Sequence, residues 1–567
     1  MTCQNLGLFF LHSAPGPRIP RNGPASDQPL PASTEALEAD LSAATISKKQ
    51  LNKEARKAAK AAKAEKAGRA EKAQAEEEED PCAANYGDVP LEELQSKVIS
   101  GRSWTDIGDL DEAAVGRSVL IRGSAQTFRP VSKTLAFVVL RQSMSSVQCV
   151  LVARADAGVS TQMVRFATSL SKESIVDVEG VVSLPKDPLK TTTQQVEIQV
   201  RKVYCITRAI PTLPINFEDA ARSEAEFDLA ERTGEKLVRV HQETRLNYRV
   251  IDLRTPGNQA TYHIKFEVEN AFRQYLSSKG FIGIHTPRLI SGSSEGGAAV
   301  FKLQYYGRDA CLAQSPQLYK QMSLCGGFGR VFEVGPIFRA ENSNTHRHLS
   351  EFIGLDAEME IKEHYFEVCD IVDGLFVAIF KHLEENCKNA LEAVNKQYPF
   401  EPLKYLEKTL KLTYEEGIQM LKESGTEIEP MGDLNTEAEK KLGCLVKEKY
   451  GTEFFILYRY PLAVRPFYTM PCYDDPAYSN SFDVFLRGEE IISGAQRVHT
   501  PELLRKRAIE CGIDASTISS YIESFSYGAP PHGGFGVGLE RVVMLFCDLN
   551  NVRKTSLFPR DPQRLTP

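Results

Sequence analysis

The chain has 567 residues, a length that predicts about three to five domains of ordinary size. Hydrophobic residues make up 42% and charged residues 25%, so most of the chain can bury a globular core. No apolar run approaches the ~18 residues needed to cross a bilayer, so we expect no membrane-spanning segment. The net charge of −7 disfavours a generic polycationic nucleic-acid binder. The twelve cysteines include no C-x-x-C pair, which disfavours a zinc site and favours reduced thiols in the cytoplasm.

Residues 1–95 are predicted to be an extension without a globular core. Residues 1–45 are rich in Pro, Ser and Ala, which is typical of disorder, and their few arginines leave a targeting peptide as the weaker alternative. Between Lys48 and Lys72, ten Lys or Arg stand against three Glu, among strong helix formers. Such a helix is either a solvated linker or a basic arm that binds a nucleic-acid backbone, and its composition leaves both readings open.

Residues 96–210 are predicted to form a small β-barrel. Five segments rich in β-branched and aromatic residues are separated by turn residues: Val119–Gly123, Leu135–Arg141, Val147–Val152, Ile175–Val182 and Gln195–Thr207. This number of short strands suggests a Greek-key barrel, and the OB-fold is the commonest nucleic-acid-binding version. The polar, acidic segment 211–236 that follows is typical of a hinge.

Residues 237–567 are predicted to be the largest domain, with both helices and long β segments. Ala260–Lys279 has the apolar spacing of an amphipathic helix, and Gly280 follows it at the position of a C-cap glycine. Leu355–Ile361 and Val331–Glu341 alternate as strands do, and each gathers charged residues on one face. Charges on a buried sheet face are costly unless they are paired or functional. These strands are therefore the first indication of a site.

Three patches concentrate charge or glycine on strands: residues 338–352, 483–497 and 533–541. The glycine-rich third patch has no surrounding βαβ unit, so it is not a dinucleotide fingerprint. We interpret it as a strand that lets a flat ligand approach the backbone, with Arg541 at the start of the next helix. Arginines suit phosphates and paired carboxylates suit Mg²⁺, so the patches together indicate a nucleotide site, although each alone is also compatible with a structural ion pair.

Six segments carry a resemblance to a known family. "FRAENSNTHRHLSEF" resembles motif 2 of the class II aminoacyl-tRNA synthetases, "GFGVGLERVV" resembles motif 3, and the helix ending in "FIGIHTPRL" is similar to motif 1. "SEGGAAVF", "QSPQLYKQ" and "GEEIISGAQRVH" narrow the resemblance to the aspartyl enzymes of eukaryotic or archaeal type. The likeness runs from about Val119 to the terminal "LFPRDPQRL". It implies an α+β fold: an N-terminal five-stranded OB-fold barrel, then an antiparallel-sheet catalytic domain flanked by helices.

The resemblance implies an aspartate–tRNA ligase, which uses ATP and Mg²⁺ to convert L-aspartate into aspartyl-adenylate and transfers it to the 3′ end of tRNA(Asp). Arg339 would bind the α-phosphate, where negative charge gathers in the transition state, and Arg541 would bind the γ-phosphate. Glu490 with Asp483 would hold Mg²⁺, and Glu490 completes the expected catalytic set with the two arginines. The other matches to the ATP-binding motifs are Ala340, Glu341, Arg347, His348, Leu349, Phe352, Gly538, Leu539 and Glu540.

For the amino acid, the resemblance places Lys320 and Arg497 at the aspartate side chain. Neutral asparagine would leave these buried cations unpaired. Lys320 and Arg497 can therefore discriminate aspartate from asparagine without a separate step that hydrolyses wrong products. In the asparaginyl relatives the Lys320 position is typically apolar and the Asp356 position is typically Glu. The structural alternative for Lys320 is an ordinary surface lysine on a helix. The remaining aspartate-binding matches are Ser294, Glu295, Gln317, Asp356 and Ser493. The resemblance places Glu295 in a mobile lid over the bound amino acid.

For the tRNA, the resemblance places anticodon contacts in the barrel and acceptor-end contacts in the motif 2 loop. Phe137 would stack on a base, although a barrel-core aromatic is the alternative. The matching residues are Arg129, Phe137, Gln148 and Glu197 in the barrel and Ser343 and Thr345 in the loop. The family also implies a homodimer through the Ala260–Lys279 helix and the strand at Pro287. Other synthetases or scaffold proteins are alternative partners for residues 1–95.

Three other functions compete with this interpretation. A catalytically silent RNA-binding or scaffold paralogue would be marked by loss of Arg339, Arg541 or Glu490, and all three are present. An asparagine-forming ligase shares the catalytic fold but would lack the barrel and the basic arm. An asparaginyl-tRNA synthetase is disfavoured by the residues at positions 320 and 356. The sequence therefore favours the aspartyl enzyme, in the cytoplasm.

Overall fold

The computed structural model describes residues 80–292 and 299–567. The chain divides into two units, Met1–Glu79 and Asp80–Pro567, and every described residue belongs to the second. The predicted basic helix and two of the expected aspartate-binding residues, Ser294 and Glu295, lie outside the described residues. Within the described part, no helix combines the length and the apolar character needed to span a membrane.

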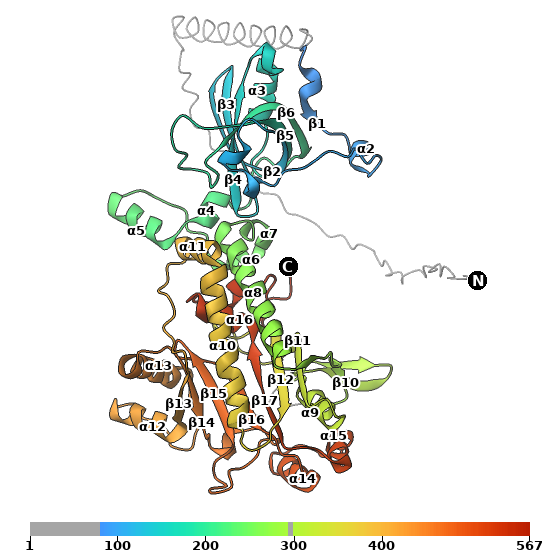
Figure 1. The fold of residues 1–567 in the computed structure, drawn as a ribbon, viewed down its shortest axis with the longest axis vertical. Coiled ribbons are helices and arrows are strands. Elements are labelled where there is room, and N and C mark those ends of the chain that lie inside the picture. The colour runs from blue at the N-terminus through green and yellow to red at the C-terminus, as the bar shows by residue number, and fades with distance from the viewer. Residues whose placement is uncertain (1–79, 293–298) are drawn as a thin grey trace, which may run out of the picture. The chain divides into compact units, whose positions relative to one another are not determined.

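The N-terminal part of the described chain is a closed β-barrel, and all five predicted strands are confirmed. Its strands are β1 (Tyr86–Asp88), β2 (Ser118–Ser132), β3 (Leu135–Gln142), β4 (Ser145–Val152), β5 (Ile175–Ser183) and β6 (Glu197–Thr207). They pair in the order β1-β6-β4-β3-β2-β5, and a further pairing of β5 with β6 closes the barrel (Figure 1). The helices of this part are α2 (Leu91–Leu94) and α3 (Thr161–Thr168). Inward-facing aliphatic side chains such as Ile121 and Val147 are fully buried.

The barrel begins earlier in the chain than residue 96. Strand β1 pairs in parallel with β6, with Tyr86 opposite Val203. Asp80 fixes this start, because its carboxylate accepts hydrogen bonds from the Cys82 backbone N–H (2.9 Å), the Tyr86 hydroxyl (2.7 Å) and the Ser160 hydroxyl (2.5 Å). Residues 80–89 therefore contribute to the barrel rather than to a separate extension.

Short helices connect the barrel to the larger domain. Residues 211–236, predicted as a hinge, contain two of them, and the connecting helices are α4 (Phe217–Ala221), α5 (Glu224–Thr233), α6 (Gln242–Asn247) and α7 (Arg249–Asp252). Helix α5 begins with a capping box, in which the Ser223 side chain accepts from the Glu226 N–H and the Glu226 carboxylate accepts from the Ser223 N–H. The segment is thus more ordered than its polar composition suggests.

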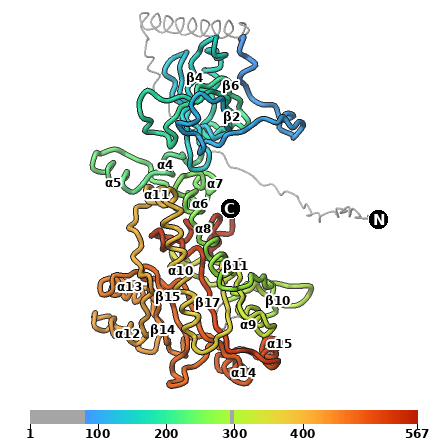
Figure 2. The backbone as a smooth tube through the Cα atoms, in the orientation of Figure 1, coloured from blue at the N-terminus to red at the C-terminus, as the bar shows by residue number. Residues whose placement is uncertain are grey.

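The large domain is built on an eight-stranded sheet that is mostly antiparallel. Its strands are β7 (Ile282–Gly283), β11 (Arg330–Phe338), β12 (Glu351–Glu360), β13 (Leu410–Thr413), β14 (Phe454–Tyr458), β15 (Ser481–Leu486), β16 (Glu489–Gln496) and β17 (His532–Gly538). They pair in the order β13-β14-β15-β16-β17-β12-β11-β7, and only β7–β11 and β13–β14 are parallel pairs. The C-terminal strand β17 thus returns to the centre of the sheet, between β16 and β12. Figure 2 shows it between the segments labelled β15 and β11. A second sheet contains β8 (Leu289–Ile290), β9 (Lys302–Tyr305) and β10 (Arg308–Leu312).

The predicted amphipathic helix is confirmed as α8 (Pro256–Ser278). Thr255 caps its N-terminus, Pro256 occupies the first helical position, and Gly280 follows its end with a φ of +78°, which glycine adopts without strain. Its apolar stripe, which includes Ile264 and Phe272, is buried inside the chain, next to α10 (Phe366–Asn386), α11 (Lys388–Gln397) and α16 (Leu539–Phe546). The chain thus covers the stripe itself, and the stripe is not the surface for the homodimer that the family implies.

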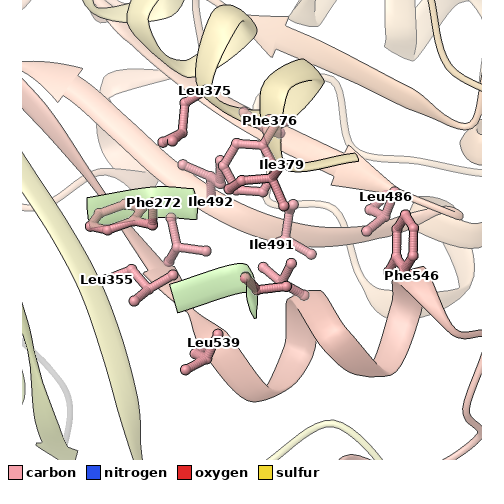
Figure 3. Close-up of a cluster of buried hydrophobic side chains, with 14 of the residues drawn as sticks. Phe272, Leu355, Leu375, Phe376, Ile379, Leu486, Ile491, Ile492, Leu539 and Phe546 are labelled. Carbon is pink, nitrogen blue, oxygen red and sulfur yellow. The ribbon is translucent and has the colours of Figure 1, made fainter. Parts of the chain in front are cut away.

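Side chains of the sheet, α10 and α16 meet in the main core of the large domain. Figure 3 shows Phe376 and Ile379 of α10 close to Ile491 and Ile492 of β16, with Leu539 of α16 nearby. Burial of such side chains stabilises the fold by roughly 1.5–3 kcal/mol each. This core fixes the sheet whose central strands carry the charged patches.

The remaining helices pack around the sheet. They are α9 (Gln317–Cys325), α12 (Tyr414–Glu423), α13 (Thr436–Tyr450), α14 (Pro501–Glu510) and α15 (Ser519–Ser524). Helices α12 and α13 share a separate hydrophobic cluster with β14 and β15, in which Leu421, Leu442 and Phe455 are buried. Helix α13 also contacts β16, so one of its faces lies at the edge of the candidate site described below.

Candidate active site

A cavity of about 450 Å³ lies over the central strands of the large sheet. It gathers most of the residues that the sequence singled out: Gln317, Arg339, Glu341, Arg347, His348, Leu349, Phe352, Asp356, Glu490, Ser493, Arg497, Gly538, Glu540 and Arg541. Ala340 and Leu539 are chain neighbours of these residues, and Lys320 and Asp483 contact the lining residues Asp356 and Arg465, respectively. Three patches that are spread between positions 338 and 541 of the sequence thus form one site.

The glycine-rich strand β17 forms part of the cavity wall, as interpreted from the sequence. Gly536 lies opposite Asp356 in the sheet, and a Cβ added at Gly536 would stand 3.1 Å from the Asp356 Oδ1 atom. A side chain at this position would crowd the carboxylate and fill the cavity. The glycine therefore leaves room for a ligand against the backbone.

Arg339 projects into the cavity just beyond the end of a strand. The sequence placed Arg339 and Glu341 within a strand, but β11 ends at Phe338. The Arg339 backbone N–H still donates to the Ser350 carbonyl (2.9 Å), which aligns the segment with β12. The Arg339 guanidinium stands 5.8 Å from the centre of the Phe352 ring. A cation and an aromatic face are thus presented side by side to a ligand.

Arg541 and Arg347 supply further positive charge on another side of the cavity. Arg541 Nη1 donates to the Glu490 carbonyl (2.8 Å), which fixes the guanidinium beside β16. Burial lowers the pKa of Arg541, although Glu490 opposes this shift. Arg347 is paired with Glu439 on α13, and its Nη1 atom lies 2.5 Å from the Glu439 Oε2 atom. The sequence analysis did not identify this carboxylate.

His348 stands among these arginines in its neutral form. Burial and then the neighbouring Arg541 and Arg347 charges lower the pKa of His348. The Thr345 and Ser343 hydroxyls lie 2.6 Å and 3.1 Å from its Nδ1 atom. Both loop residues expected at the tRNA acceptor end therefore also restrain the imidazole ring.

The expected metal ligands Asp483 and Glu490 differ in their environments. Asp483 is paired with Arg465, which the sequence analysis missed, through contacts of 3.0 Å and 2.7 Å. Burial and then the Asp483 charge raise the pKa of Glu490 to about 7. A nearby cation would stabilise the ionised form of such a carboxylate. Among the described residues there is no cluster of three or more metal-ligating side chains.

Lys320 and Arg497 converge beneath the cavity floor on one buried carboxylate. Lys320, on helix α9, is only 1% exposed, so the surface-lysine alternative is wrong. Its Nζ lies 3.1 Å from Asp356 Oδ1 and 3.3 Å from Glu358 Oε2, and Arg497 Nε lies 2.9 Å from Glu358 Oε1. Burial opposes ionisation of Glu358, yet the two cations outweigh it and lower the pKa of this carboxyl. The pocket is thus built around fixed, buried charges.

Three functional candidates were missed by sequence reasoning: Glu358, Glu439 and Arg465. A signal existed for Glu358, since it shares a strand face with Asp356. None existed for Glu439, which lies on helix α13, 92 positions from the arginine that it contacts. Arg465 lies in a connection after β14, and only the fold brings it to Asp483.

In the barrel, the four expected tRNA-binding residues lie on adjacent strands. Arg129 is directly opposite Phe137, and its guanidinium stands 4.5 Å from the centre of that ring. Gln148 is opposite Glu197 and donates to its carboxylate (2.5 Å). Phe137 is half-buried, whereas its neighbours Ala136 and Val138 are buried in the barrel core. The four residues thus form two cross-strand pairs, Arg129 with Phe137 and Gln148 with Glu197. Between the pairs, Phe137 is opposite Val150 and Gln148 is opposite Val139. We call the four residues the barrel strip.

The sequence matches a known family over most of the large domain. The family model described as tRNA synthetases class II (D, K and N) matches residues 241–562. An Arabidopsis thaliana protein named aspartate–tRNA ligase 2, cytoplasmic, is 64% identical over 501 residues, which cover 87% of this chain and 90% of that protein. The human protein named aspartate–tRNA ligase, cytoplasmic, is 51% identical over 490 residues, which cover 86% of this chain and 96% of that protein.

Solved structures agree with the sequence relatives. The aspartyl-tRNA synthetase from Entamoeba histolytica is 44% identical with a TM-score of 0.79, over 85% of this chain and 96% of that one. The asparaginyl-tRNA synthetase from Pyrococcus horikoshii, complexed with asparaginyl-adenylate, is 28% identical with a TM-score of 0.70, over 82% of this chain and 100% of that one. The chain belongs to the class II aminoacyl-tRNA synthetases and, within them, to the aspartyl-tRNA synthetases.

Proposed function

We propose that the 450 Å³ cavity binds ATP and L-aspartate together, forms aspartyl-adenylate, and transfers the aspartyl group to the 3′-terminal ribose of tRNA(Asp). Family membership makes the chain an aspartate–tRNA ligase, and the proposal concerns which of its residues perform each part of the reaction. The observation that carries it is the pair of buried cations, Lys320 and Arg497, around Glu358 at the cavity floor.

The nucleotide half of the cavity uses Arg339, Arg541 and Phe352. Arg339 contacts the α-phosphate, so its guanidinium stabilises the charge that develops when the aspartate carboxylate attacks phosphorus. Arg541 contacts the γ-phosphate and keeps ATP bent, while the adenine ring stacks on Phe352 beside Glu341. The aspartate carboxylate is already ionised at neutral pH, so this step needs no general base and depends on positioning.

Class II aminoacyl-tRNA synthetases use a divalent metal ion with ATP, and we assign Mg²⁺ to the carboxylates of Glu490 and Asp483. The raised pKa of Glu490 supports this assignment, because a cation would stabilise its ionised form. When bound, Mg²⁺ would neutralise charge on the departing pyrophosphate. Arg465 orients Asp483 for this role through its two contacts.

The aspartate side chain is selected by Lys320 and Arg497, with Glu358 holding both cations in place. Asparagine carries no negative charge, so it would not pair with Lys320 and Arg497 once water has been displaced from them. Binding of asparagine is therefore strongly disfavoured. Asp356, Gln317 and Ser493 complete the amino-acid half, and Ser294 with Glu295 remain candidates from outside the described residues. The strip formed by Arg129, Phe137, Gln148 and Glu197 is assigned to the anticodon loop.

The function is tested by aminoacylation with purified tRNA(Asp) and tRNA(Asn), each offered aspartate and asparagine. We expect efficient product only with aspartate on tRNA(Asp). Asparaginyl product on tRNA(Asn) would identify an asparaginyl enzyme instead. Failure of all four reactions, with intact tRNA binding, would favour the catalytically silent paralogue.

We further propose a homodimer in the cytoplasm. The relatives cited above are named cytoplasmic, which supports that location. Support for the dimer comes from exposed apolar residues close to motif 1: Phe266 on α8, Ile282 on the edge strand β7, and Leu289 on β8 are each about half exposed. A second copy of the chain would cover these side chains.

A further inference from the structure

A second cavity, of about 200 Å³, lies among the connecting helices and the C-terminal segment, apart from the residues of the candidate active site. Its wall combines residues of the 222–249 region, the start of α8, Tyr398, and the segment 550–554 that follows α16. Six cationic side chains line it: Arg222, Arg239, Arg245, Arg249, Arg553 and Lys554. Only two lining side chains, Glu224 and Asp252, are acidic.

Some of this positive charge is compensated by carboxylates next to the cavity. Arg239 pairs with Glu224 (2.6 Å), Arg222 pairs with Asp219 (3.0 Å), and Arg553 pairs with Asp561 (2.7 Å). These three arginines need no further anion. The remaining three cations decide the net charge of the cavity.

Two of those three share a single carboxylate. Asp252 lies 2.6 Å from Arg245 Nη1 and 2.5 Å from Arg249 Nη1, and both Asp252 and Arg249 are buried. One negative charge thus serves two guanidinium groups. The pair of arginines keeps a surplus positive charge in a place with little access to water.

Lys554 is the third cation, and in the described part of the chain no carboxylate lies within 4.0 Å of its Nζ atom. The ammonium group instead stands 4.0 Å from the centre of the Tyr398 ring. Burial, and then the Arg245 charge, lower the pKa of Lys554 to about 8, even though Glu224 and Asp252 oppose the shift. The free protein therefore holds this cation at an energetic cost that a bound anion would remove.

We propose that this cavity is a binding site for a phosphate group, with Lys554 and Arg245 as its cationic contacts. The Arg249 guanidinium adds positive charge but no contact, because its nitrogens already donate to Asp252, to the Tyr262 hydroxyl and to backbone carbonyls. The two uncompensated positive charges match a phosphate dianion, and arginine and lysine are the side chains that bind phosphate oxygens most often. The volume admits a phosphate carrying a small group such as a pentose but not a whole nucleotide triphosphate. The phosphate belongs either to a small phosphorylated metabolite or to an RNA backbone.

The test measures how fast Lys554 is acetylated by acetic anhydride at pH 8, read peptide by peptide by mass spectrometry. Only the neutral amine reacts, and at this pH about half of Lys554 is neutral. A bound dianion that raises the pKa by about one unit should lower the labelling rate roughly fivefold. The probe is inorganic phosphate at about 20 mM, against sodium chloride of equal ionic strength. Lys422, exposed on α12, serves as the internal control and corrects for reagent lost to phosphate.

Protection of Lys554 without protection of Lys422 supports the site, and an unchanged Lys554 rate, whether fast or slow, overturns it. Two further arms separate the sources of the phosphate: protection by ribose 5-phosphate at millimolar concentration indicates a small metabolite, and protection by tRNA at micromolar concentration indicates an RNA backbone. Neither arm requires catalytic activity, so failure here is distinguishable from failure of the proposed function.

A matched pair of variants provides a second measurement. Lys554→Met keeps the length of the side chain and removes its charge, and Lys422→Met does the same on an exposed helix. We expect inorganic phosphate to raise the melting temperature less in Lys554→Met than in the wild type, and equally in Lys422→Met and the wild type. An equal rise in all three proteins would mean that phosphate binds only elsewhere.

Discussion

At the scale of single residues, the site depends on charges that are held in place before a substrate arrives. Arg541 is fixed by a backbone carbonyl, Arg347 by Glu439, and Arg497 by Glu358. Preorganised groups of this kind stabilise a transition state without reorganising during the reaction. Substitutions at this scale should therefore affect substrate binding and rate without unfolding the chain.

We predict that Arg339→Ala lowers aspartate-dependent ATP–pyrophosphate exchange by at least about 100-fold, because it removes the cation assigned to the α-phosphate. Binding of tRNA should stay within about threefold, since the barrel strip is unchanged. Arg505→Ala, which removes an exposed arginine on α14, is the matched control. Exchange near the wild-type rate in Arg339→Ala would show that another group binds the α-phosphate.

We predict that Glu439→Gln raises the KM for ATP about tenfold, equivalent to roughly 1.4 kcal/mol. The Glu439 carboxylate orients Arg347 and also accepts weakly from the Glu490 backbone N–H (3.4 Å), so its loss loosens the phosphate side of the cavity. The KM for aspartate should not change, because Lys320 and Arg497 lie elsewhere. Glu437→Gln, an exposed change on the same helix, is the control. A rise in both KM values would instead indicate a general disturbance of the fold.

At the scale of elements, α8 and the short edge strand β7 show that different residues serve the stability of the chain and its assembly into a dimer. The buried stripe of α8 belongs to the core of its own chain, whereas Phe266 on its other side is 57% exposed and Ile282 on β7 is 50% exposed. An edge strand with an apolar side chain is a ready surface for another chain. Assembly is thus expected to depend on the exposed residues and not on the stripe.

We predict that Ile282→Glu converts a dimer of about twice the 63.1 kDa chain mass into a monomer, because a charge would be buried at the subunit contact. Light scattering coupled to size exclusion at micromolar concentration measures this. Ile509→Glu, on the exposed side of α14, should leave the mass unchanged. A wild-type mass of one chain would refute the dimer directly.

At the scale of the whole molecule, a basic segment precedes a chain of net negative charge. The ten Lys or Arg between Lys48 and Lys72 contrast with the net charge of −7. A contact with four to six phosphates should contribute about −3 to −5 to the slope of log K against log salt. The structure defines the truncation that tests this: removal of residues 1–79 keeps Asp80, whose carboxylate fixes the start of the barrel.

We predict that this truncation weakens tRNA binding most at low salt and flattens the salt slope over about 50–300 mM. Adenylate formation should not change, because every motif of the catalytic site lies in the remaining chain. Specificity for the aspartate anticodon should persist with Arg129, Phe137 and Gln148. Equal slopes for both proteins would assign the basic segment to a protein partner.

The sequence by itself determined the five barrel strands, the amphipathic helix and most of the residues around the main cavity. The strands and the helix were predicted from local periodicity, and the cavity residues from motifs that resemble a family. Both periodicity and motifs are properties of short stretches of chain. The partners of those residues depended on the tertiary structure. Glu439, Glu358 and Arg465 contact their partners in the site only because distant strands and helix α13 meet there.

The tertiary structure also decided where charge and apolar surface are compensated. The stripe of α8 predicts burial but cannot say whether its own chain or a second subunit covers it, and the fold shows its own chain. The surplus charge around Lys554 is likewise invisible in the sequence, because it arises when the connecting helices, Tyr398 and the C-terminal segment enclose one cavity. The sequence determines the local conformational preference of each segment. Which charges are paired and which apolar surfaces are buried depends on how distant segments pack together.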